Sequence, residues 1–125
     1  ATVFVTNRSS THDYSSAMKY GAISFVTNGN YPIFKTTRLQ EEIIEALTYS
    51  QPHDLLLFSG SSVVAALCMA TWIEMHGTAR VLLWDRTQDQ YVLRVITKQD
   101  IRTEIERVAD RLEGTTNRVV RRGTA

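Results

Sequence analysis

Short apolar runs alternate with longer segments of helical periodicity along most of the chain. Runs rich in β-branched and aliphatic residues favour strands, whereas apolar residues spaced three and four positions apart favour helices. The sequence predicts strands at residues 2–6, 22–27, 54–58, 79–84 and 90–96, and helices at residues 12–20, 37–51, 63–75 and 97–113.

The order of these elements predicts the fold class. Strands and helices alternate as β-α-β-α-β-α-β-β-α, which favours a mostly parallel sheet with helices on both faces. The polar segment at residues 85–89 has the length of a hairpin loop, so the last strand is expected to be an antiparallel edge strand. We therefore predict a three-layer α/β sandwich with Rossmann-like connectivity and an antiparallel edge hairpin.

Two of the predicted helices differ in how they should be buried. In residues 37–51, Leu39, Ile43 and Leu47 form one stripe, which predicts a helix with a single buried face. Residues 63–75 are apolar on most sides, which predicts a largely buried helix.

The last predicted helix carries one apolar stripe and precedes a basic segment. We expect Gly114 to end this helix, because glycine is the usual residue just beyond a helix C-terminus. This divides the chain into a single α/β domain at residues 1–114 and a C-terminal tail at residues 115–125. The tail has three arginines and no acid, so it carries +3 and leaves −2 on the domain. The stripe consists of Ile101, Ile105, Val108 and Leu112.

Composition indicates a single domain without covalent cross-links. The chain has 125 residues, of which 43% are hydrophobic, and this is enough for one core. Its single cysteine, Cys68, excludes an intramolecular disulfide. No apolar run approaches the roughly 18 residues of a membrane span, and no signal-peptide pattern opens the sequence. These features predict a protein of the cytoplasm with no membrane contact.

Small polar residues follow the first and third predicted strands. In open α/β sheets, ligands bind outside the carboxyl ends of the strands. A helix N-terminus after the third strand would attract an anion, Gly60 would allow close approach to the backbone, and Arg8 would donate to a phosphate. We therefore predict a nucleotide or other phosphate-bearing ligand at this edge; the alternative is that Ser61 or Ser62 only caps a helix. The candidate residues are Thr6, Asn7, Arg8, Ser9, Ser59, Gly60, Ser61 and Ser62.

Other chemical motifs are incomplete. Ser59-Gly-Ser61 lacks the flanking glycines of a hydrolase nucleophile elbow, and the Gly-Lys-Ser/Thr end of a P-loop is missing. The three histidines lack metal-ligand spacing, so we expect neither a metal nor a cofactor. His12, beside Asp13, is the one candidate acid or base, and helix capping is the competing interpretation of that cluster.

Three segments resemble small uncharacterised α/β proteins encoded by tailed phages. They are Phe4-Val-Thr-Asn-Arg-Ser-Ser-Thr-His-Asp-Tyr14, Asp54-Leu-Leu-Leu-Phe-Ser-Gly60 and Ala79-Arg-Val-Leu-Leu-Trp84, and the likeness runs over residues 3–96. This resemblance implies a phage protein of the infected host cytoplasm, with the virion as the alternative location. It implies no particular activity.

The loops at residues 6–10 and 59–62 are also similar in placement to the ligand loops of CARF-type Rossmann domains. That resemblance implies binding of cyclic oligoadenylates by a dimer. Val63 and Val64 stand where that family would carry a lysine after the second loop, which is a departure from its pattern.

Three classes of function follow. The first is a non-enzymatic phage accessory protein that binds the phosphate-bearing ligand. The alternative is an interaction or virion-associated protein that uses the same loops and the basic tail to contact a phage or host protein. The third is an enzyme, such as a phosphodiesterase using His12. A slightly acidic domain makes nucleic acid an unexpected partner, except through the tail.

We also expect a homo-oligomer. The helix at residues 63–75 has more apolar faces than a small monomer easily covers, and Trp72 and Met75 are expected near its exposed end. The predicted contact is this helix or an edge strand.

Overall fold

The computed structural model describes residues 1–30, 34 and 36–121. Strands and helices follow in the predicted order, and the segment between the first two strands is a 3-10 helix, η1. The elements are β1 (Thr2–Arg8), η1 (Ser15–Tyr20), β2 (Ala22–Asn28), α1 (Thr36–Leu47), β3 (Leu55–Leu57), α2 (Ser62–His76), β4 (Thr78–Asp85), β5 (Gln90–Thr97) and α3 (Lys98–Arg121).

The five strands form one sheet in the order β2-β1-β3-β4-β5. β1 pairs in parallel with β2 and β3, β3 pairs in parallel with β4, and β5 is antiparallel to β4. The predicted α/β class and its antiparallel edge are thereby confirmed. The chain leaves β1 toward β2 and then returns past β1 to β3, so its winding direction changes between β1 and β3. Such a switch point is where doubly wound sheets bind ligands.

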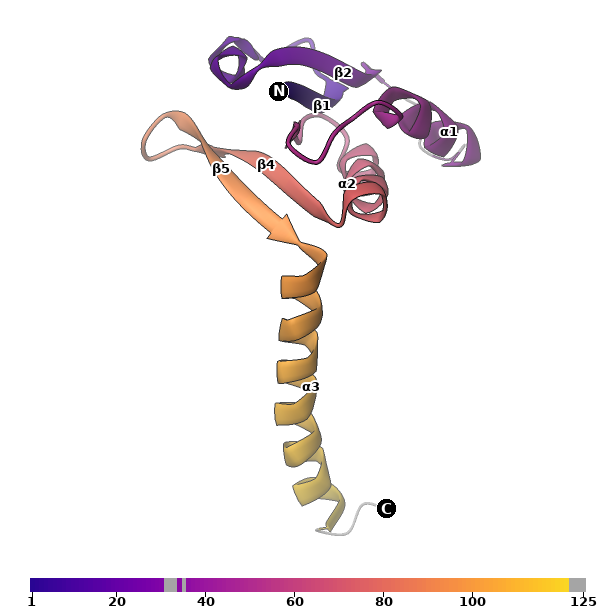
Figure 1. Ribbon diagram of the computed structural model, residues 1–125, viewed down its shortest axis with the longest axis vertical. Coiled ribbons are helices and arrows are strands. Elements are labelled where there is room, and N and C mark those ends of the chain that lie inside the picture. The colour runs from indigo at the N-terminus through magenta and orange to yellow at the C-terminus, as the bar shows by residue number, and fades with distance from the viewer. Residues whose placement is uncertain (31–33, 35, 122–125) are drawn as a thin grey trace.

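Helices cover the two faces of the sheet unequally (Figure 1). α1 and α2 pack on one face, where Leu39, Ile43 and Trp72 join side chains of the sheet in one buried cluster. On the other face, Ala17 of η1 packs in a second cluster with the alternate side chains of β1 and β3. β3 is buried on both faces, as suits three consecutive leucines in the middle of a parallel sheet.

Two predicted helices have different bounds or form. The segment expected to form a helix from residue 12 is irregular up to η1, because Asp13 Oδ1 accepts the N–H of Ser15 at 2.9 Å and forms a local turn instead. α1 ends at Leu47, four residues before the predicted limit. Ser50 Oγ donates to the Leu47 carbonyl at 2.7 Å and satisfies an acceptor at that helix end.

Trp72 does not lie at an exposed end of α2, contrary to expectation. Its side chain is fully buried, and its ring packs edge-on against Phe4 with centroids 5.6 Å apart. Met75 is exposed as expected. The loss of Trp72 from the surface removes most of the reason for expecting α2 to be an oligomer contact.

α3 projects away from the rest of the molecule (Figure 1). The side chain of Thr97 caps it by accepting the N–H of Asp100 at 3.0 Å. Gly114 does not end the helix, which continues to Arg121. Gly114 has no positive φ, and a glycine in helical conformation weakens a helix by roughly 1 kcal/mol without terminating it. Within the described residues, no helix is both long and apolar enough to span a membrane.

Candidate functional site

Asn7, the next-to-last residue of β1, joins the loops that follow β2 and β3. Its side-chain nitrogen donates to Thr27 Oγ1 and to the carbonyl oxygen of Gly29, both at 2.9 Å. Its side-chain oxygen faces the N–H of Ser61 at 3.5 Å. Asn7 is buried, so these contacts position two loops beside each other instead of leaving the amide free for a ligand.

Thr6 fixes the start of the loop after β3. Its hydroxyl oxygen accepts the N–H of Ser59 and donates to the carbonyl of Ser59, both at 3.0 Å. The Thr6 side chain is fully buried. The structure therefore places Thr6 beneath the predicted ligand site, where its two hydrogen bonds connect β1 to the 59–62 loop.

Gly60 is required by both its backbone conformation and its neighbours. Its φ is +71°, and a Cβ at this position would overlap the side-chain amide of Asn7. The next residue, Ser61, is the N-cap of α2, and its Oγ accepts the N–H of Val64 at 3.4 Å. Ser61 therefore caps α2, and it also lines the cavity described below. Ser62 is the first residue of α2 and is exposed.

Tyr14 holds the segment that follows β1 against the sheet. Its hydroxyl oxygen accepts the N–H of Ser9 at 2.8 Å and lies 2.6 Å from Ser59 Oγ. Its ring packs edge-on against Phe25 of β2, with centroids 5.3 Å apart. Tyr14 thus connects the ends of β1, β2 and β3, although the candidate residues named from the sequence do not include it.

These loops enclose an open cavity of about 740 Å³ at the switch point. Five of the predicted site residues line it, whereas Thr6 and Ser59 lie beneath it and Ser62 is not among its lining residues. The cavity-lining residues are Asn7, Arg8, Ser9, Ser10, Gly29, Asn30, Gly60 and Ser61.

Arg8 is the charged residue of this lining set. Its side chain is exposed, and its guanidinium carbon lies 4.9 Å from the centroid of the Phe25 ring. Stacking on an aromatic face orients the guanidinium and leaves its N–H groups available to a ligand. The arrangement can therefore bind an anion between Arg8 and the start of α2.

The candidate set named from the sequence omits Ser10, Gly29 and Asn30 of the cavity wall, although Ser10 and Gly29 follow the first two strands at the same edge. Gly29 and Asn30 come from the turn after β2, and Ser10 comes from the segment that Tyr14 holds. The Asn28-Gly-Asn30 turn signal was a usable indication, because β1 and β2 are parallel neighbours and their ends meet at one edge.

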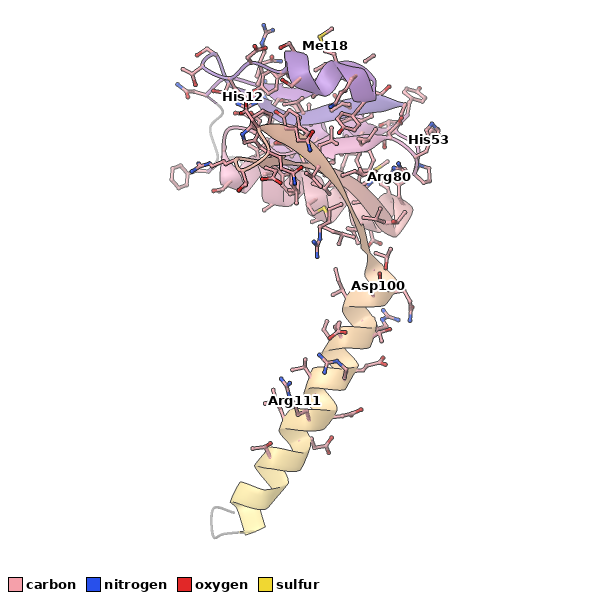
Figure 2. All side chains as sticks on the ribbon, turned by 90° about the vertical axis from the view of Figure 1, so that its left-hand side faces the viewer. His12, Met18, His53, Arg80, Asp100 and Arg111 are labelled. Atoms are coloured by element: carbon pink, nitrogen blue, oxygen red, sulfur yellow. The ribbon has the colours of Figure 1, made fainter. Side chains whose placement is uncertain are left out.

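His12 lies outside the cavity-lining set. Its Nε2 is 2.9 Å from the hydroxyl of Tyr91, and Figure 2 shows it beside the beginning of β5, far from α3. Burial, with smaller effects from Tyr14 and Asp13, raises the pKa of Tyr91 above its ordinary value. In residues 1–30, 34 and 36–121, no group of three or more His, Cys, Asp and Glu side chains could hold a metal ion.

Comparison with known proteins places most of the chain in one family model. The family model of the phage Pam3 gp32-like protein matches residues 1–98. The matched range includes all five strands and every cavity-lining residue, and it ends at the first residue of α3. No curated protein and no solved structure matches the chain.

Proposed function

The chain belongs to the phage Pam3 gp32-like protein family, and from that premise we propose a non-enzymatic phage accessory protein that binds a nucleotide or another phosphate-bearing ligand. The observation that carries this proposal is the cavity of about 740 Å³ at the switch point, with Arg8 on one side and the start of α2 on the other. A volume of this order suits a nucleotide-sized molecule.

Electrostatics favours an anionic ligand in this cavity. The first N–H groups of α2 have no acceptor within the helix, and the helix dipole places roughly half a positive charge at that end. Gly60 presents no side chain, so a phosphate can approach the backbone closely. Arg8 adds a full positive charge with planar donors.

Binding is a better fit than catalysis because these hydroxyl groups at the sheet edge have structural partners. Thr6 bonds to Ser59, Ser59 contacts Tyr14, and Ser61 caps α2. His12, the candidate acid or base, contacts Tyr91 and is not among the lining residues. The proposed place of action is the cytoplasm of the infected host, with the virion as the alternative.

Calorimetric titration of the parent protein and Arg8→Ala tests this proposal. The titrants are inorganic phosphate, mononucleotides and cyclic oligoadenylates. We expect the parent to bind at least one and Arg8→Ala to bind at least tenfold more weakly, while losing only about 0.5–1 kcal/mol of stability with its contact to Phe25.

Arg86→Ala is the matched control, because Arg86 is exposed in the loop between β4 and β5 and makes the same change of charge away from the cavity. A parent protein that binds none of these ligands at millimolar concentration contradicts the proposal.

The second candidate function is an interaction protein that contacts a phage or host protein. The observation that favours it is the exposure of Arg8, Ser10 and Asn30 on the loops around the cavity, where a protein surface could contact them. A parent protein that binds no phosphate-bearing ligand but binds another phage protein would support this candidate.

A further inference from the structure

α3 presents an apolar stripe that the described part of the chain does not cover. Ile101, Ile105 and Leu112 are 46%, 61% and 54% exposed. The helix extends away from the sheet, and its side chains point outward on all sides (Figure 2). Burying these residues requires a surface from outside the part of the chain that the structure describes.

The spacing of the stripe matches the seam of a two-helix coiled coil. The stripe has intervals of four, three and four residues, which are the intervals between alternating d and a positions of a heptad repeat. Its residues are Ile101, Ile105, Val108 and Leu112. The groove along them is lined by Asp100, Ile101, Glu104, Ile105, Val108, Ala109 and Leu112. A second helix with the same spacing would fit its knobs into this groove.

We propose that this stripe binds the same stripe of a second copy of the chain, with the two helices antiparallel. Ile105 then packs opposite Val108 of the second copy, and Ile101 packs opposite Leu112. Each pairing occurs twice because the arrangement is symmetric. In this arrangement the sheets of the two copies lie at opposite ends of the helix pair. Because α3 projects away from the sheet in Figure 1, the second copy can reach the stripe.

Charge complementarity selects the second copy as the occupant and the antiparallel direction. Glu104 and Arg111 are seven residues apart and flank the same side of the stripe, at g positions. In the antiparallel register that pairs Ile105 with Val108, Glu104 of each copy faces Arg111 of the other. In a parallel pair, Glu104 would face Ala109 and gain no ion pair.

The flanking charges are free to make these contacts. Arg107 binds Oε2 of Glu104 within the helix, at 3.0 Å from Nε and 2.8 Å from Nη2, which leaves Oε1 for the second copy. Arg111 is exposed, and Figure 2 shows it on the projecting part of α3. This inference goes beyond the proposed function, because none of these residues lines the cavity.

The test measures the mass of the full chain in solution over micromolar to near-millimolar concentrations. By sedimentation equilibrium we expect the parent to approach twice the chain mass of 14.2 kDa. Ile105→Asp should restore the monomer, because it places two unpaired carboxylates in the apolar seam.

Charge reversals test the register. Glu104→Arg and Arg111→Glu each replace two attractions with two repulsions, so each should raise the dissociation constant about tenfold. The double variant Glu104→Arg/Arg111→Glu should return it close to the parent value. Glu106→Arg is the matched control, since it makes the same substitution away from the seam and should leave the mass unchanged. Circular dichroism checks that α3 stays helical in every variant.

Each result decides the proposal. A parent protein that is monomeric throughout the concentration range overturns the proposal. This holds also if the monomer binds vesicles of anionic phospholipid, because the stripe would then serve a membrane surface. A dimer that persists in Ile105→Asp overturns it by placing the contact elsewhere. A double charge reversal that fails to recover dimerisation overturns the antiparallel register.

Discussion

At the scale of single residues, the carboxyl edge of the sheet is held by hydrogen bonds between side chains and neighbouring loops. The side chain of Asn7 donates hydrogen bonds to Thr27 and to Gly29 after β2. Thr6 forms two hydrogen bonds with Ser59, and the hydroxyl of Tyr14 accepts the N–H of Ser9 in the segment after β1. Walls fixed in this way are preorganised, so the proposed ligand would cost them little entropy on binding. These residues shape the cavity, and Arg8 supplies its charge.

Gly60→Ala should destabilise the protein more than Gly29→Ala does. Both glycines have a positive φ, at +71° and +62°, so an alanine at either position should cost about 1–2 kcal/mol in backbone strain. Only at Gly60 does the new Cβ overlap Asn7, which should add about 1–3 kcal/mol. Urea denaturation of the two variants measures the difference. Equal losses would show that Asn7 moves away without cost.

Cys68 should make the protein less stable as the pH rises above about 9. Burial raises the pKa of its thiol from 9.0 to about 12, so between these values the unfolded chain loses a proton that the folded chain keeps. The stabilisation is complete below pH 9.0 and is lost as the pH rises to about 12, by up to about 1.4 kcal/mol per pH unit.

Urea denaturation between pH 8 and pH 10 measures this effect. The range stays at or below the ordinary pKa of tyrosine, about 10, so that tyrosine ionisation adds little to the pH dependence. Cys68→Ala is the control and should show a flatter profile, although its stability at neutral pH is lower because a cavity replaces the sulfur. Identical slopes in the two proteins would rule out the thiol as the cause.

At the scale of elements, α1 is buried as its sequence pattern predicts, and α2 is less buried than its pattern suggests. α1 buries one stripe as predicted. α2 is apolar on nearly all sides, yet only Val64, Cys68 and Trp72 are buried along it. Small residues occupy much of its remaining surface, and Met75 is exposed. A helix rich in alanine and other short side chains has a sequence pattern that predicts burial on all sides. Its exposed faces nevertheless carry little apolar area, because the side chains are small.

Adjacent isoleucines in α1 provide a direct test of which face is buried. Ile43 is fully buried and Ile44 is 51% exposed. Ile43→Ala should lower the free energy of unfolding by about 2–5 kcal/mol, because it leaves a cavity between α1 and the sheet. Ile44→Ala should change it by about 0.5 kcal/mol or less. Similar losses for both variants would mean that α1 is rotated about its axis.

At the scale of the whole molecule, a body of five strands and their covering helices is joined to a projecting helix. The body contains both buried clusters and the cavity. α3 meets it at the end of β5, where the N–H of Lys98 donates to the carbonyl of Gly77 at 2.8 Å. The family match covers the body and stops where α3 begins.

A chain that ends after residue 98 should therefore fold with nearly the parent's stability. It keeps the bond from Lys98 to Gly77 and both clusters, so we expect the free energy of unfolding to change by less than about 1 kcal/mol. It should also be monomeric, because it lacks the proposed contact. Thermal denaturation and light scattering measure the two properties, and a truncated chain that fails to fold would show that α3 is part of the body.

The sequence by itself determined the order of the elements, the mostly parallel sheet with its antiparallel edge, and the edge where Asn7, Arg8 and Gly60 meet. Local periodicity carries this information, because apolar spacing sets the type of element and alternation sets the sheet. Only the tertiary structure decided which hydroxyl groups have partners. Tyr14 meets Ser59 across 45 positions and Thr6 meets Ser59 across 53, and such distant pairs depend on strand order and register. The structure likewise decided that α3 runs through Gly114, because continuing helical hydrogen bonds outweigh the weak helix preference of one glycine.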